Sequence, residues 1–170
     1  TAEGRSGWGY LPTPPYVRDN PAVNYDGVTT DQIRNGGFES NFDLWIPNGA
    51  VITSNPVFSG SKAAQLGGAV NSTATLTQRT FVIPGGLRSG ELSYWWRLET
   101  SEAAGSAADS MVVELLDADT GDAVFRTVQV VNSAATRNTW QKLTVDVTGD
   151  GYKRAAVRFT VVNNSSAPTA

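Results

Sequence analysis

The stretch Leu92-Ser-Tyr-Trp-Trp-Arg-Leu98 places an apolar or aromatic side chain at every even position. Successive side chains of an extended strand point to opposite faces, so the even residues share one face: Leu92, Tyr94, Trp96 and Leu98. Trp95 and Arg97 fall on the other face. The pattern predicts a β-strand whose even positions lie against a core.

The same period of two recurs at residues 111–116 and 157–162. Further strand candidates are 50–54, 62–67, 73–82, 123–131 and 140–147. Turn sequences separate them: Pro84-Gly-Gly86, Asp117-Ala-Asp-Thr-Gly121 and Thr148-Gly-Asp-Gly151. No segment carries a helical apolar stripe, and the Ala-rich 101–108 is short and interrupted by glycine, which predicts a loop. About eight short strands predict an all-β fold, an antiparallel jelly-roll β-sandwich.

Residues 1–32 differ in composition from the rest, since they hold four of the eight prolines. Leu11-Pro-Thr-Pro-Pro-Tyr16 favours an extended, polyproline-like chain. We therefore divide the chain into an N-terminal arm or linker, 1–32, and a jelly-roll domain, 33–170. The aromatic content of the arm suits either a cover for an apolar patch of the domain or the tail of a preceding domain.

The chain has 170 residues and contains neither histidine nor cysteine, which excludes imidazole catalysis, Cys-His sites and disulfides within it. Its formal net charge of −3 argues against a general nucleic-acid binder. No apolar run has the length of a membrane span. The polar, lysine-poor composition favours a secreted or cell-surface protein, and the absence of a signal sequence at Thr1 predicts an excised piece of a longer precursor.

Two segments and the order in which they occur resemble the opening of bacterial carbohydrate-binding modules with a galactose-binding-like fold. They are Asn35-Gly-Gly-Phe-Glu-Ser40, followed by Trp45, and Phe58-Ser-Gly-Ser-Lys-Ala-Ala-Gln-Leu66. The resemblance covers about residues 33–162 and implies a non-catalytic accessory domain. One feature departs from it, because such modules usually finish with an Asp-Asp-Val-like strand and 163–170 supplies none. An early end, or the arm filling the vacant edge, would each account for this.

The resemblance also implies a structural calcium ion. Its ligands would come from the segments around Gly37, Glu39, Ser59 and Lys62, with Glu39 giving the carboxylate and the others backbone carbonyls. The missing terminal acidic residue would remove one ligand. The competing interpretation is that Glu39 only accepts hydrogen bonds from nearby backbone amides.

A sugar-binding face needs an exposed aromatic ring beside planar polar groups. Strand parity makes Trp95 the candidate platform, with Arg97, Glu114 and Arg158 as hydrogen-bonding groups on matching faces. In the competing interpretation Trp95 is covered by the arm or a loop, and the arginines form ion pairs with Glu99 or Glu114. The other candidate rings, Trp45 and Trp140, are more typical of core positions.

Two segments that resemble a catalytic or a metal-binding motif lack features that the motif requires. The triplet Asp119-Thr-Gly121 matches that of an aspartic protease, but it lacks the apolar strand that precedes the triplet in those enzymes. A calcium-binding EF-hand loop starting at Asp117 would need glycine at its sixth position and glutamate at its twelfth, where this chain has Asp122 and Val128. A hairpin turn is the better prediction. A glycosidase with two carboxylates stays possible in principle but ranks below the other functions.

The sequence therefore predicts a carbohydrate-binding-like module of a secreted bacterial protein, not an enzyme. Its expected partners are a polysaccharide or glycan and the neighbouring domains of the same precursor, without nucleic acid or a membrane span. The alternative is a structural or protein-interaction sandwich attached to a secreted peptidase or other surface protein.

Overall fold

The computed structural model describes residues 32–83, 90–151, 153–164 and 169–170. All of the predicted arm except Gln32, and the predicted turn at Pro84-Gly-Gly86, lie outside these residues. The described part holds no α-helix and no helix long and apolar enough to cross a membrane.

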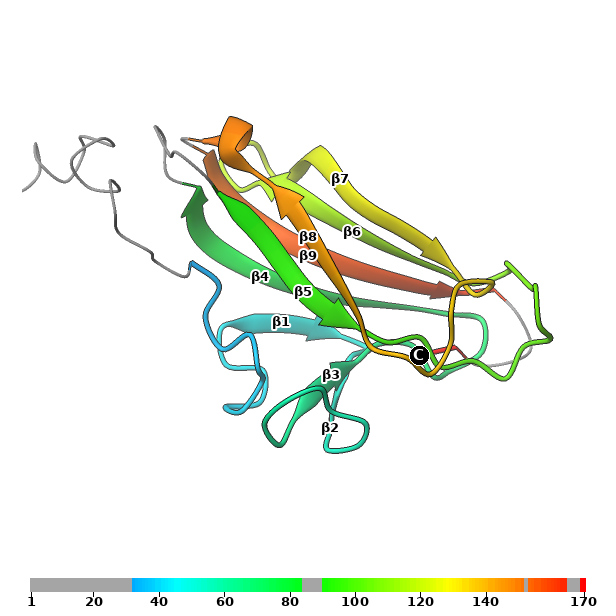
Figure 1. Ribbon diagram of the computed structural model, residues 1–170. Helices are drawn as coiled ribbons and strands as arrows, with labels where there is room; N and C mark the ends of the chain where they lie inside the picture. The colour runs from blue at the N-terminus through cyan, green and yellow to red at the C-terminus, as the bar shows by residue number, and fades with distance from the viewer. Residues whose placement is uncertain (1–31, 84–89, 152, 165–168) are drawn as a thin grey trace, which may run out of the picture.

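Nine β-strands and a single 3₁₀ turn make up the described chain (Figure 1). The strands are β1 (Trp45–Asn48), β2 (Val51–Thr53), β3 (Ala63–Gln65), β4 (Ser72–Ile83), β5 (Glu91–Trp96), β6 (Ser110–Asp117), β7 (Ala123–Asn132), β8 (Gln141–Asp146) and β9 (Lys153–Asn163). The 3₁₀ turn, η1 (Thr148–Asp150), joins β8 to β9. The alternation at 92–98 is confirmed in β5, where even positions are half-buried and odd positions exposed.

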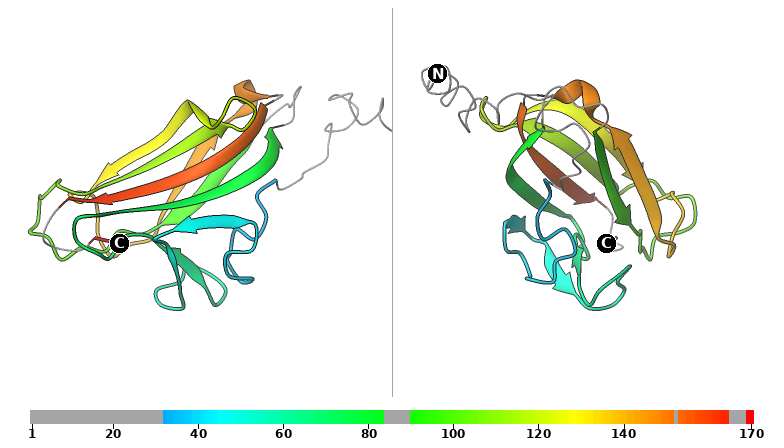
Figure 2. Two further views of the ribbon diagram at one scale, coloured as in Figure 1. Left: turned by 180° about the vertical axis from the view of Figure 1, so that it is seen from behind. Right: turned by 60° about the vertical axis from the view of Figure 1, so that its left-hand side comes forward.

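Five strands form one antiparallel sheet in the order β1-β4-β9-β6-β7. Its centre, β9, has an unbroken register with β6, while β-bulges interrupt the β4–β9 and β6–β7 pairs. Bulges increase the local twist and bend of a strand. The view from behind in Figure 2 shows the resulting curved sheet.

The opposing layer consists of two separate hairpins, β2–β3 and β5–β8 (Figure 1). The inner face of the five-stranded sheet supplies most of the core, including Leu76, Val113 and Val157. From the opposing layer, the Tyr94 ring meets the Phe159 ring edge-on at 5.1 Å between centroids. The all-β antiparallel sandwich predicted from the sequence is confirmed.

One strand was not predicted. No strand was expected at residues 45–48, whereas Trp45 begins β1, which pairs with β4 at the sheet edge. Only Trp45 of this strand is buried, so no alternation marks it in the sequence. Pro47, which cannot donate a ladder hydrogen bond, is tolerated because β1 is an edge strand. The prediction that Trp45 packs in the core is confirmed, since it is 8% exposed.

The predicted turn at Asp117–Gly121 is also confirmed. It joins β6 to β7, and the carbonyl of Asp117 accepts hydrogen bonds from the amides of Thr120 and Asp122. Gly121 and Asp122 both have positive φ, at 73° and 67°. Residues 101–108 form the predicted loop.

Candidate functional site

The outer face of β5–β8 carries three cross-strand pairs of exposed side chains. The register sets Trp95 opposite Lys142, Ser93 opposite Thr144, and Glu91 opposite Asp146. Directly opposed residues share one face of an antiparallel pair. An aromatic ring, an ammonium group, two hydroxyls and two carboxylates therefore line one surface of the smaller layer.

Trp95 belongs to an aromatic cluster, which we define as Phe58, Trp95 and Trp140. The rings of Phe58 and Trp95 stack with centroids 3.9 Å apart and planes 16° apart. Trp140 meets Phe58 edge-on at 5.8 Å. Phe58 lies in the β2–β3 loop and Trp140 just before β8, so three chain segments meet here.

Two of the three rings of the aromatic cluster are exposed to solvent. Trp95 is 42% exposed and Phe58 is 47% exposed, while Trp140 is half-buried. The Trp95 side chain is therefore exposed to solvent rather than buried. Trp140 was predicted as a core residue and instead packs on Phe58 in the cluster. The sequence analysis gave no role to Phe58, because the loop conformation that brings it to Trp95 leaves no periodic signal.

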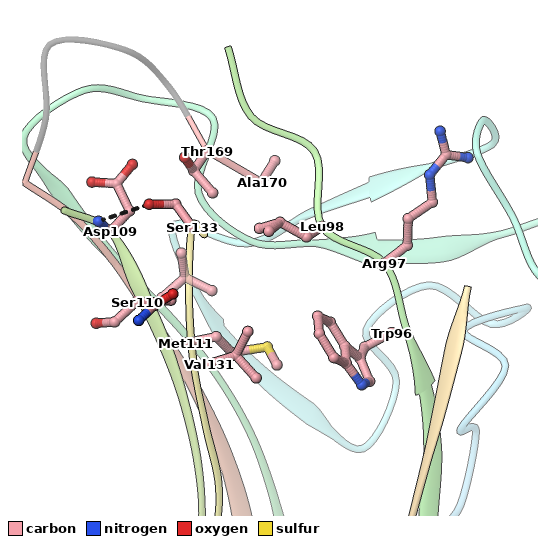
Figure 3. A pocket seen from close by; sticks show the side chains of 12 residues that line it. Trp96, Arg97, Leu98, Asp109, Ser110, Met111, Val131, Ser133, Thr169 and Ala170 are labelled. Carbon is pink, nitrogen blue, oxygen red and sulfur yellow. Dashed lines mark hydrogen bonds between the residues drawn. The ribbon is translucent and has the colours of Figure 1, made fainter. Parts of the chain in front are cut away.

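Arg97 lies one residue beyond the end of β5 and forms an ion pair with Glu99, with 2.8 Å between Nη2 and Oε1. Its Nε is buried and has no hydrogen-bond partner among the described residues. Figure 3 shows its side chain pointing away from the other labelled residues. The ion pair matches the competing interpretation of the arginines and makes Arg97 less available to a ligand.

Glu114 and Arg158 lie on the opposite outer surface of the sandwich. Their neighbours Val113, Leu115 and Val157 belong to the core, so period two turns Glu114 and Arg158 outward on β6 and β9. Trp95 faces outward from the other layer. The four residues predicted as one site therefore do not meet.

Glu114 and Arg158 form an ion pair with each other across β6 and β9. The two residues are directly opposed in the β6–β9 register, and Oε2 of Glu114 accepts hydrogen bonds from Nη2 of Arg158 at 2.7 Å and from Nε at 3.2 Å. This is the cross-strand ion pair that the sequence analysis kept as an alternative. Both side chains are half-buried, and a directly opposed cross-strand pair of opposite charges contributes roughly 0.2–1 kcal/mol to stability.

The predicted calcium ligands gather in the loops before β1 and β3. Oε1 of Glu39 accepts the amides of Ser61 and Lys62 at 2.8 and 3.1 Å, and Oε2 accepts the Ser61 hydroxyl. The hydrogen bonds to Ser61 hold the pKa of the Glu39 carboxyl below its usual range. Nζ of Lys62 donates to the Glu39 carbonyl at 2.9 Å and to Asn41 Oδ1 at 3.0 Å.

This donor set does not fit a calcium ion. The Lys62 ammonium group occupies the backbone and amide oxygens, and both Glu39 carboxylate oxygens already accept hydrogen bonds. Within the described ranges, no group of three or more acidic residues could hold a metal ion. Gly37 and Ser59 are exposed loop residues that lie near this cluster in sequence. We derive no role for a metal here.

A small pocket at the end of the sandwich is no alternative sugar site (Figure 3). It encloses about 40 Å³ among Trp96, Leu98, Met111 and Val131, beside the buried Asp109. A single water molecule needs roughly 10–15 Å³ of such cavity volume, so the pocket has room for a few water molecules and is too small for a sugar ring. Asp109 is bonded within the fold, because its Oδ1 accepts the Asn164 amide at 2.7 Å.

Fold and surface together define a two-layer antiparallel β-sandwich with an aromatic cluster on its smaller layer, and solved structures share this fold. "Family 16 Carbohydrate Binding Module-2" matches with a TM-score of 0.54 and 17% identity, over 82% of this chain and 94% of that one. CBM28, a carbohydrate-binding module specific for non-crystalline cellulose, matches with a TM-score of 0.51 and 13% identity, over 83% and 90%.

A third match is the CBM22-1 and GH10 modules of endo-1,4-beta-D-xylanase 10B from Clostridium thermocellum, complexed with xylohexaose. Its TM-score is 0.50 at 13% identity, over 84% of this chain and 27% of that one. No family model and no curated protein matches the sequence. The chain thus has the β-sandwich fold of these carbohydrate-binding modules.

Proposed function

We propose that this chain is a non-catalytic carbohydrate-binding module and that a polysaccharide chain binds across the outer face of β5–β8. The observation that carries the proposal is the aromatic cluster, exposed at Trp95 and Phe58, beside a row of polar side chains on the same face. The fold likeness to carbohydrate-binding modules supports it.

The chemistry of the face suits a sugar. Aromatic rings offer apolar contact to the C–H face of a pyranose, and a few placed polar groups fix its orientation. Ser93 and Thr144 can each donate and accept, Lys142 donates, and the carboxylates of Glu91 and Asp146 accept. All five side chains are exposed, so a ligand can reach them without moving the core.

The length of the row favours an extended glycan over a single sugar. From Trp95 to Glu91 the strand rises roughly 13 Å at about 3.3 Å per residue. Lys142, opposite Trp95, takes the cationic role that the sequence analysis gave to Arg97 and Arg158.

Such a module would belong to a secreted or cell-surface protein. Its effect there would be to hold neighbouring domains of the same polypeptide near a polysaccharide, because tethering raises the effective concentration of the second partner. Secretion rests on the polar, lysine-poor composition alone.

Affinity gel electrophoresis through soluble polysaccharides tests the proposal. The panel would include hydroxyethyl cellulose, xylan, mixed-linkage β-glucan and galactomannan. We expect at least one polysaccharide to retard the chain, and Trp95→Ala to weaken that binding about tenfold, which corresponds to about 1.4 kcal/mol.

Val130→Ala is the matched control. Val130 is 68% exposed on β7, in the other sheet, so its truncation also removes exposed apolar surface while leaving the proposed face intact. Retardation should be unchanged in this variant. Equal retardation of Trp95→Ala and the parent, or no binding across the panel, would overturn the proposal.

A further inference from the structure

Charge is distributed unevenly along the outer face of β5–β8. The ammonium group belongs to Lys142, which lies opposite Trp95 at the aromatic end of the face. The carboxylates belong to Glu91 and Asp146, which lie opposite each other at the far end. Trp95 and Glu91 are separated by a rise of roughly 13 Å, at about 3.3 Å per residue, and so are Lys142 and Asp146. One end of the face is therefore cationic and the other is anionic.

The two carboxylates of the anionic end are not neutralised within the described part of the chain. Neither Glu91 nor Asp146 forms an ion pair with a described lysine or arginine. Like charges that are directly opposed on two strands destabilise the pairing of those strands. The stability of the β5–β8 hairpin therefore gives no reason for two acidic residues at this position.

Hydrogen bonds fix one of these carboxylates in its ionised form. The amide of Thr148 donates to Oδ1 of Asp146 at 2.8 Å, and the Thr148 hydroxyl accepts the amide of Gly90 at 2.8 Å. The hydrogen bonds from Thr148, together with the charge of Arg126, hold the pKa of Asp146 below its usual range. Arg126 is itself paired with Asp150, which offsets its charge. The end of β8 thus keeps a negative charge at neutral pH.

The acidic pair is placed to act on a bound ligand. Both side chains are exposed, and so are Ser93 and Thr144, which separate them from the aromatic end. At an ionic strength of 0.1 M, exposed charges interact over about 10 Å. A sugar unit that contacts Glu91 and Asp146 lies within this distance of both carboxylates, whereas the backbone of Lys142 is roughly 13 Å away along the strand. An acidic group on that sugar unit would meet two negative charges at close range.

An uncharged sugar unit gains from the same two side chains. An ionised carboxylate can only accept hydrogen bonds, and bonds that it accepts from hydroxyls are roughly twice as strong as bonds between neutral groups. Glu91 and Asp146 therefore match a ligand that presents hydroxyl donors and repel one that presents another carboxylate. Specificity commonly combines attraction for one ligand with repulsion of its competitor in this way.

We infer that Glu91 and Asp146 restrict this face to glycans whose sugar units carry no acidic group where they lie over these two residues. The inference rests on the proposed glycan-binding function and adds a substrate class to it, namely uncharged polysaccharides rather than polyuronates and other polyanionic glycans. Trp95 and Phe58 supply a stacking contact that any pyranose can use. The acidic pair selects among those sugars by charge.

Matched polysaccharides test the inference by affinity gel electrophoresis. Hydroxyethyl cellulose is compared with carboxymethyl cellulose, and galactomannan with carboxymethyl galactomannan, so that the backbone is shared and the charge differs. In low-salt buffer, the neutral polysaccharide should bind at least about tenfold more tightly than its carboxymethylated partner. At 1 M salt, where the Debye length falls to about 3 Å, the difference should shrink to less than about threefold.

A double variant assigns the effect to the two residues. Glu91→Gln combined with Asp146→Asn removes both charges and keeps a hydrogen-bond acceptor at each position. We expect this variant to bind each neutral polysaccharide within about threefold of the parent, and to bind the carboxymethylated partner almost as tightly. The matched control is Asp119→Asn combined with Asp122→Asn, in the turn that joins β6 to β7 of the five-stranded sheet. It removes the same number of charges and should discriminate as the parent does.

The possible failures of the inference and of the proposed function are distinct. Equal or tighter binding of the carboxymethylated polysaccharide by the parent would overturn the inference while glycan binding stands. Discrimination that persists at 1 M salt, or in the Glu91→Gln and Asp146→Asn double variant, would overturn it as well, because charge at these residues would not be its cause. Loss of discrimination in the control would assign the effect to the net charge of −3. No retardation by any polysaccharide would remove the proposed function and this inference with it.

Discussion

Glu39 illustrates how far a single residue can be interpreted from its sequence context. The motif around it implied a calcium ligand, with backbone hydrogen bonding as the competing interpretation. The structure supports the latter geometry, because both carboxylate oxygens accept hydrogen bonds from Ser61 and Lys62. The resemblance placed the Glu39 and Lys62 segments together correctly, but it did not specify that the Lys62 ammonium group would donate to the Glu39 backbone carbonyl and to Asn41 Oδ1.

These contacts predict a pH-dependent contribution of Glu39 to stability. Its pKa is lowered in the folded chain, mainly by the Ser61 hydrogen bonds, so the unfolded state binds more protons as the pH falls. The contribution is present above the ordinary glutamate pKa of 4.5 and is lost as the pH falls through the lowered folded-state pKa. Urea unfolding at pH 7 should therefore find Glu39→Gln less stable than the parent.

At a pH below the lowered pKa of Glu39 the two proteins should converge, because the parent carboxylate is then protonated in the folded chain as well. A stability difference that is the same at both pH values would show that the charge of Glu39 contributes nothing to holding the loops together.

At the scale of elements, alternation predicted the strands that have one buried face. It found β5 because its even positions pack inward, and it missed β1 because only Trp45 of that strand is buried. Alternation also assigned Glu114 and Arg158 correctly to outward faces. It could not assign them to a sheet, because the period of two is the same in both layers, and for that reason Trp95 was placed with residues of the opposite surface.

The two layers are connected by a specific contact between β5 and β7. The Tyr94 hydroxyl donates to Gln129 Oε1 at 2.7 Å, and burial raises the pKa of Tyr94. Tyr94→Phe keeps the ring contact with Phe159 and removes this hydrogen bond. We expect it to lower the free energy of unfolding by about 1 kcal/mol, seen as a lower urea midpoint with an unchanged m value.

A double-mutant cycle with Gln129→Ala separates this bond from other effects. Once Gln129 is truncated, Tyr94→Phe should cost much less. Additive effects of the two substitutions would mean that the hydroxyl and the amide do not stabilise each other.

At the scale of the whole molecule, the five-stranded sheet forms one layer of the sandwich, and the aromatic cluster lies on the other, smaller layer. Among the described residues, the smaller layer presents the aromatic cluster on its outer face and consists of two hairpins, β2–β3 and β5–β8, that do not pair with each other. The sandwich itself was predictable from the number and pattern of the strands. The division of the smaller layer into two hairpins was not, because it depends on long-range pairing that local patterns do not encode.

Backbone NMR shift mapping tests most directly whether a glycan binds the outer face of β5–β8. The labelled chain is titrated with a soluble oligosaccharide of whichever polysaccharide retards it. We expect shifts concentrated at Phe58, Ser93, Trp95, Lys142 and Thr144. Shifts concentrated instead around Glu114 and Arg158, on the opposite surface, would contradict it.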